Sequence, residues 1–176
     1  TVEVTYTSAE EGAGNEVIVT NVTVSGATTP NLKLSADGLT TNDADFVTYY
    51  FDMSGNGSWS GTVGDIKLRF KTSSAGATCS AGTVFFDKIE IVSAIAANAT
   101  NTFDFNGSVD GWTASTYTTA TAGPAYTTVE LTSANRSHNF ENTSAGINTA
   151  LGTHLAITIK NNTTNNRLRV ILTRSS

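Results

Sequence analysis

The alternation of apolar and polar residues along this chain predicts β-strands almost everywhere and almost no helix. At residues 65–71, Ile66, Leu68 and Phe70 alternate with polar or charged residues. This period of two places one set of side chains on one face of a strand. Strand-forming patterns also occur at five other places, namely residues 16–24, 46–52, 83–92, 154–160 and 167–173.

The strands after residue 82 each have an apolar face that we expect to point into a core. The side chains expected to point inward are Phe85, Ile89, Ile91, Leu155, Ile157, Ile159, Leu168, Val170 and Leu172. Glycine- and serine-rich stretches at 54–61 and 73–82 predict loops. The polar residues 161–166 predict a hairpin turn between the last two strands. The pattern therefore predicts an all-β sandwich of antiparallel strands.

Two short segments carry a resemblance to a known family, in an unexpected order. Residues 103–112 read Phe-Asp-Phe-Asn-Gly-Ser-Val-Asp-Gly-Trp, and residues 82–89 read Gly-Thr-Val-Phe-Phe-Asp-Lys-Ile. They resemble the opening and closing strands of carbohydrate-binding-module-like β-jelly-roll domains of secreted bacterial surface proteins. In that family the opening segment comes first, whereas here it follows the closing one.

This order implies a jelly roll whose halves are permuted. Residues 1–92 would form the C-terminal half of a module, 93–101 a linker and 102–176 the N-terminal half. The family order would bring the end of the chain beside residues 1–7. Either the ends of one chain meet and a single permuted domain folds, or a neighbouring copy completes each half.

Completion by a neighbour would use the strands at the two ends of the chain. Half a jelly roll leaves edge strands unpaired, and an added strand can satisfy them. A head-to-tail contact of this kind generates open filaments. The residues expected to form the assembly strands are Val2, Val4, Tyr6, Leu168, Val170 and Leu172.

Composition excludes several partners and disfavours catalysis. A net charge of −5, with only 14% charged residues, argues against nucleic acid and anionic lipid as partners. No apolar run is long enough to predict membrane insertion. The single cysteine, Cys79, excludes an internal disulfide and is expected to be a free thiol in a loop. His138 and His154 lack a catalytic motif and are expected at the surface, so the sequence predicts that the chain is not an enzyme.

The resemblance also implies a structural calcium ion. Asp87 and Asp104 lie in the closing and opening strands, which are adjacent in many members of the family and carry a calcium site. Asn106 and Asp110 would add further oxygen ligands, and calcium requires six to eight. The alternative is that these residues only cap strands and turns.

Sugar binding requires exposed aromatic rings beside hydrogen-bonding groups. Tyr117 and Tyr126 lie in a region rich in threonine, alanine and glycine, so we expect them to be exposed. Trp59 and Trp112 are further candidates, although in the resembling family the corresponding tryptophans usually pack against the sheet.

Three functions follow from these features. The expected function is a non-catalytic extracellular structural repeat, in which copies of the chain assemble head-to-tail into a surface fibre or adhesin. The alternative is a carbohydrate-binding module of a secreted polysaccharide-degrading protein, with polysaccharide as the partner. The third is an enzyme with a jelly-roll fold, such as a polysaccharide lyase.

Overall fold

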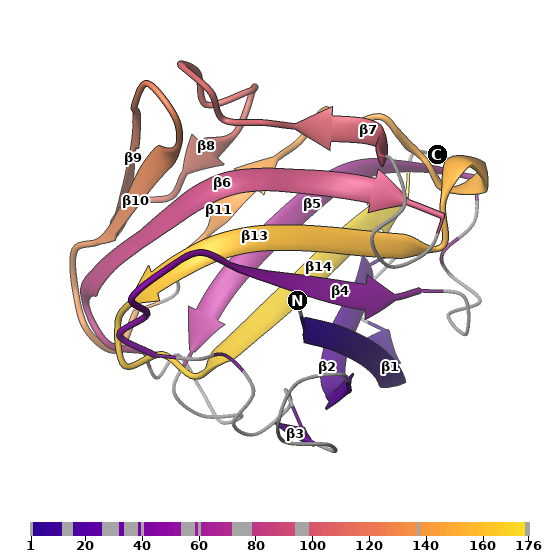
Figure 1. Ribbon diagram of the computed structural model, residues 1–176, viewed down its shortest axis with the longest axis horizontal. Coiled ribbons are helices and arrows are strands. Elements are labelled where there is room, and N and C mark those ends of the chain that lie inside the picture. The colour runs from indigo at the N-terminus through magenta and orange to yellow at the C-terminus, as the bar shows by residue number, and fades with distance from the viewer. Residues whose placement is uncertain are drawn as a thin grey trace.

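The chain folds into two layers of β-strands, which Figure 1 shows one behind the other. The computed structural model describes residues 2–11, 16–25, 32–33, 39, 41–53, 59, 61–71, 79–93, 99–136 and 138–174. Within these residues the only helical element is one 3₁₀ turn, Thr149–Leu151. The predicted all-β class, with antiparallel strands, is confirmed, whereas the jelly-roll connectivity stays a prediction.

The first layer is built around the long strand β6 and its neighbour β13. Its strands, in spatial order, are β9 (Thr118–Ala122), β10 (Thr127–Leu131), β6 (Gly82–Val92), β13 (His154–Asn162), β4 (Val47–Asp52) and β1 (Val2–Glu11). A further strand, β7 (Ala99–Phe103), also pairs with β6. All of these pairs are antiparallel except β1 with β4, which is parallel.

The second layer lies behind the first in Figure 1 and is centred on β5. Its strands, in spatial order, are β8 (Thr113–Ala114), β11 (Phe140–Asn142), β5 (Thr62–Lys71), β14 (Arg167–Arg174) and β2 (Glu16–Ser25), while β12 (Ile147–Asn148) pairs with β5 and β3 (Leu32–Lys33) with β2. Because β1 and β2 also pair with each other, hydrogen bonds run continuously from one layer to the other along one side of the sandwich.

Strands from residues 1–92 and from residues 102–176, the two predicted halves, are mixed within both layers. β13 lies between β4 and β6, and β14 lies between β5 and β2. Residues 99–101, which were expected to be part of a linker, belong instead to β7 and pair with β6. β14 does not pair with β1, because β2 lies between them. The described strands of the two halves therefore form one fold within this chain.

The prediction of a hairpin at residues 161–166 is wrong. β13 pairs with β4 and β6, and β14 pairs with β2 and β5, so the two strands lie in different layers. The connection crosses between the layers, and we call it the interlayer arch. Its side chains Asn161, Thr163 and Asn165 are buried, with at most 3% of their surface exposed. A polar composition that is typical of an exposed turn is here the composition of a buried hydrogen-bond network.

The arch is held by bonds among its own side chains and to two other segments. The Asn161 Oδ1 atom accepts bonds from the backbone N–H and hydroxyl of Thr163, at 3.2 and 2.7 Å. Asn165 donates to the hydroxyl of Thr163 at 2.8 Å and exchanges two bonds with the backbone of Ser80. The backbone N–H of Asn161 donates to the Asp43 carboxylate at 2.8 Å. The arch thereby fixes two loops at this end of the sandwich.

The predicted inward faces of β5, β13 and β14 are confirmed wherever side chains are described. Those of β5 and β13 are at most 1% exposed, and Leu168 and Val170 of β14 are also buried. The face predicted for β6 is only partly right. Ile89 and Ile91 are buried, but Phe86 rather than Phe85 joins them in the core. The reason is a β-bulge opposite Thr158 and Ile159, where one extra residue of β6 reverses the alternation.

Aromatic rings fill the core beneath β6. Trp112 stacks on Phe140 with ring centroids 4.9 Å apart, and Phe105 contacts both rings at 5.7–5.9 Å. Phe86 packs edge-on against Phe105 and lies 4.9 Å from Phe140. All four residues are at most 2% exposed. This cluster supports the loop from Asp104 to Trp112 from below.

Candidate functional site

The candidate site lies where strand β6 changes partners along one edge. Residues 82–86 of β6 pair with β10, and residues 89–92 pair with β7. Asp87 and Lys88 fall in the gap between these two partners, next to the bulge in the pairing of β6 with β13. The partner strands diverge here, and their ends form the walls of a surface pocket.

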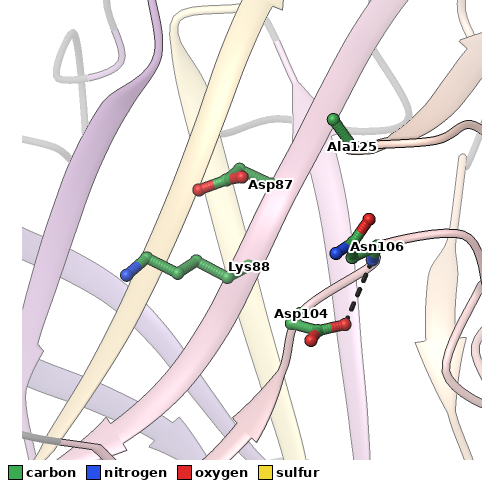
Figure 2. A pocket seen from close by; sticks show the side chains of 5 residues that line it. All are labelled: Asp87, Lys88, Asp104, Asn106 and Ala125. Carbon is green, nitrogen blue, oxygen red and sulfur yellow. Dashed lines mark hydrogen bonds between the residues drawn. The ribbon is translucent and has the colours of Figure 1, made fainter.

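This pocket, which we call the β6 pocket, has a volume of about 230 Å³. It is lined by Asp87, Lys88, Asp104, Asn106 and Ala125. Figure 2 shows Asp87 and Lys88 on β6, whereas Asp104 and Asn106 lie on the chain that leaves β7. The structure therefore brings together three of the four predicted calcium ligands.

The fourth predicted ligand, Asp110, has a different role. Its carboxylate accepts bonds from the backbone N–H groups of Asp104 and Phe105, at 2.8 and 3.1 Å, and from the Ser108 hydroxyl. Although partial burial alone would raise the pKa of Asp110, these bonds lower it. Asp110 thus holds the loop that presents Asp104 and Asn106, and it does not line the pocket.

The charges around the pocket are unevenly compensated. The ammonium group of Lys88 pairs with the Glu90 carboxylate at 2.9 Å. Partial burial raises the pKa of Asp87; Lys88 opposes this shift, while the nearby carboxylates of Glu90 and Asp104 reinforce it. Asp104 accepts a bond from the backbone N–H of Asn106 at 3.1 Å. Three carboxylates and one ammonium therefore lie in or beside this pocket.

The calcium site stays a prediction. The described residues contain no group of three or more histidine, cysteine, aspartate or glutamate side chains arranged to hold a metal. Asp87, Asp104 and the amide oxygen of Asn106 are the side-chain ligands that the pocket offers, so carbonyls and water would complete the six to eight that calcium needs.

Excess calcium added to metal-stripped protein is expected to raise the melting temperature by several degrees if calcium binds the β6 pocket, because a ligand that binds only the folded state stabilises it. Asp104→Asn should reduce this rise, and Glu130→Gln, on the exposed part of β10, should not. Differential scanning fluorimetry measures both, and a melting temperature that calcium does not change would contradict the prediction.

Exposed aromatic rings adjoin the pocket. Tyr126 lies 5.7 Å from Phe46 and 5.3 Å from Phe85, measured between ring centroids. Tyr126 is 36% exposed and Phe46 38% exposed, while Phe85 is partly buried. We call these three residues the aromatic patch. It meets the β6 pocket through Ala125, the chain neighbour of Tyr126.

The other predicted sugar-binding residues lie elsewhere. Tyr117 is 37% exposed, as expected, but it precedes β9, whereas Tyr126 follows that strand. The guanidinium carbon of Arg136 lies over the ring of Tyr117, 5.1 Å from the ring centroid. Trp112 is 2% exposed in the core, so its indole is not available to a sugar. Trp59 packs against the core and donates from Nε1 to the carbonyl of Gly152 at 3.0 Å.

The predicted assembly strands each pair with two other strands of the same chain, along part of their length. β1, which contains Val2, Val4 and Tyr6, pairs with β2 and β4. β14, which contains Leu168, Val170 and Leu172, pairs with β2 and β5. In the described pairing, Val4, Val170 and Leu172 have partners on both sides, whereas Tyr6 pairs only with β2 and Leu168 only with β5. At the doubly paired positions, a neighbouring copy could add a strand only by displacing one of this chain.

A buried cysteine–histidine pair corrects the expectation that His138 lies at the surface. His138 is 1% exposed, and its Nδ1 atom lies 2.9 Å from the Cys79 sulfur. The thiol is free and also contacts the carbonyl of Arg136 at 2.8 Å. The backbone carbonyl of Cys79 accepts a hydrogen bond from the backbone N–H of Asn135 at 3.0 Å. The pair anchors the turn after β10 and is closed to solvent, so we assign it a structural role.

Lowering the pH from about 7 to about 5.5 is expected to destabilise the fold through His138. Burial lowers the pKa of this imidazole, against a weaker opposing effect of the Ser133 carbonyl. As the pH falls, the unfolded chain therefore binds the proton first and gains stability relative to the native state. His138→Gln should flatten the decline of the unfolding free energy as the pH falls. Urea denaturation at a series of pH values measures this decline. If the unfolding free energy falls equally steeply with pH in wild type and in His138→Gln, the prediction is wrong.

The sequence pattern did not predict Lys88, Ala125, Phe46 or Phe85 as site residues. One signal was available. The apolar residues Val84 and Phe86 are at even positions, whereas Ile89 and Ile91 are at odd positions. All four can face the core only if one extra residue, a β-bulge, lies between Phe86 and Ile89. That shift places Phe85 outward and marks the bulge where the pocket forms.

No helix in the described part of the chain is long and apolar enough to span a membrane. Comparison of the sequence and structure with protein-family models, curated proteins and solved structures found no match.

Proposed function

We propose that this chain is a non-catalytic carbohydrate-binding module of a secreted protein, with the β6 pocket and the aromatic patch as its sugar site. The observation that carries this proposal is that exposed aromatic rings lie next to a polar pocket, with Tyr126 directly following Ala125 of the pocket lining. The apolar face of a sugar ring can stack on an aromatic side chain, while aspartate, asparagine and lysine exchange hydrogen bonds with its hydroxyl groups. A pocket of about 230 Å³ suits one sugar unit of a longer chain.

The proposal is also supported by the closure of the sandwich within one chain. The strands that a head-to-tail repeat would exchange each already pair with two strands of the same chain, on both sides at Val4, Val170 and Leu172. A module that binds a polysaccharide requires no second copy. We therefore favour binding over assembly.

Replacing Tyr126 with alanine tests the proposal, with Tyr117→Ala as a matched control. The two tyrosines have nearly equal exposure, 36% and 37%, and lie at opposite ends of β9. We expect Tyr126→Ala to weaken retention on a bound polysaccharide about tenfold, which corresponds to about 1.4 kcal/mol for one stacking ring. Tyr117→Ala should bind like the wild type.

Affinity electrophoresis through gels that contain single polysaccharides measures this retention, after circular dichroism has shown that both variants fold. The panel should include cellulose derivatives, xylan, chitin derivatives, chitosan and polygalacturonate. Failure of the wild type to bind any of them, or equal losses in the two variants, would contradict the proposal.

A head-to-tail structural repeat is the second proposal. Its support is the β1–β2 pair, which alone joins the two layers on one side and is the element that two copies would exchange. Light scattering coupled to size-exclusion chromatography separates the two functions. Compact monomers favour the binding module, and concentration-dependent chains or fibres that deletion of residues 2–25 abolishes favour the repeat.

A further inference from the structure

We infer that the β6 pocket selects a sugar unit that carries a free amine over neutral and acidic sugars. This inference rests on the proposed function, because it names the class of glycan for the same site. It follows from the balance of charge in the pocket, from the Asp87 carboxylate, which no hydrogen-bond donor of the described residues reaches, and from the position of the aromatic patch.

The pocket has an excess of negative charge. Asp87 on β6 and Asp104 on the chain after β7 both line it, and Glu90 lies close to Asp87 on β6. The one cation in the lining, Lys88, is held by Glu90 at 2.9 Å. Counting these four groups, three carboxylates against one ammonium leave a formal charge of −2. The next cation on this face, Lys160, donates to the carbonyl of Ala44 at 2.7 Å. A uronic acid would add a fourth carboxylate and be repelled.

The Asp87 carboxylate is the group best placed to receive a cation. In the described part of the chain, no hydrogen-bond donor reaches it. Burial and, more weakly, Glu90 and Asp104 raise its pKa, and the charge of Lys88 only partly opposes this shift. An ammonium group offers three donors and a positive charge, and charge-assisted bonds of this kind are stronger than those of a hydroxyl. A protonated sugar amine would therefore satisfy Asp87 better than any neutral sugar.

The aromatic patch places a sugar chain next to this carboxylate. Phe85 precedes Asp87 by two residues on β6, and Tyr126 follows Ala125 of the pocket lining. When one sugar unit stacks on Tyr126, the next unit of the same glycan chain would therefore lie at the β6 pocket.

The test compares two ligands that differ only in the group on the sugar nitrogen. Isothermal titration with chitosan oligosaccharides and with fully acetylated oligosaccharides of the same length is carried out in mildly acidic buffer containing EDTA. We expect the free amines to bind about tenfold tighter, as one charge-assisted hydrogen bond predicts. Oligogalacturonate should bind more weakly than neutral cello-oligosaccharides.

Two substitutions that remove the same charge separate the pocket from the general acidity of the chain. Asp87→Asn should abolish the preference for the free amine, so that the variant binds the free-amine and the acetylated oligosaccharides equally. Asp65→Asn, on β5 in the other layer, should leave the preference intact. If both variants reduce it equally, the preference comes from net charge alone and the inference is wrong.

The remaining outcomes distinguish this inference from the proposed function. Binding of neutral or acetylated glycans, with Tyr126→Ala sensitivity but no preference for amines, would overturn the inference and leave the proposed function standing. Binding of oligogalacturonate that appears only when calcium replaces EDTA would assign the pocket to a metal ion instead, and would also overturn it. Absence of binding to every glycan would overturn both.

Discussion

Trp112→Ala is expected to lower the free energy of unfolding by about 3–5 kcal/mol, the usual cost of removing a large buried aromatic side chain. Trp112 is 2% exposed, stacks on Phe140 and meets Phe103 and Phe105 edge-on. Truncation would leave a cavity under the loop that carries Asp104 and Asn106. The variant should therefore also lose ligand binding at the β6 pocket.

Trp112→Phe is the control for this prediction. The indole Nε1 atom is buried and has no hydrogen-bond partner among the described residues. Phenylalanine keeps a stacked ring and removes this unsatisfied donor, so the loss should be much smaller than for alanine. Chemical denaturation monitored by circular dichroism measures both variants. Equal destabilisation by alanine and phenylalanine would contradict the assigned packing.

Asn165→Ala is expected to cost about 2–4 kcal/mol, because it leaves several buried polar groups without partners. The amide of Asn165 accepts from the backbone of Ser80 at 2.8 Å and donates to its carbonyl at 3.0 Å. It also donates to the Thr163 hydroxyl at 2.8 Å. Losing it would free the loop at Ser80 and the interlayer arch together.

Asn162→Ala is the control, because Asn162 is an exposed residue of the same arch. Its substitution should change the unfolding free energy by less than about 0.5 kcal/mol, as for ordinary surface positions. Urea denaturation of the two variants provides the comparison. Similar effects at both positions would show that the arch is solvated rather than buried.

The function proposed for this chain depends on a local irregularity of a regular sheet. The bulge in β6 turns Phe85 outward, and the change of partner from β10 to β7 opens the space beside Asp87. Bulges often lie beside functional sites, since they redirect side chains and interrupt pairing. Here both effects act on adjacent residues, so the aromatic patch and the polar pocket have a single structural origin.

The sequence alone predicted the all-β class, since alternation with period two is a local property of each strand. It placed Ile66, Leu68 and Phe70 correctly in the core. It also grouped Asp87, Asp104 and Asn106, through the resemblance to jelly-roll modules, and these three residues line one pocket. The class and the core face of β5 could be predicted because alternation is local to a strand, whereas the grouping of the three polar residues came from the resemblance, and their role as calcium ligands stays a prediction.

Only the tertiary structure decided which strands became neighbours and which polar residues became buried. The interlayer arch has the composition of an exposed turn, yet Asn161 and Asn165 are buried because their partners, at Asp43 and Ser80, come from distant parts of the chain. His138 is buried for the same reason, through its contact with Cys79. Composition reports the polarity of a residue, whereas burial depends on whether long-range contacts satisfy that polarity, and this is fixed only when the two layers meet.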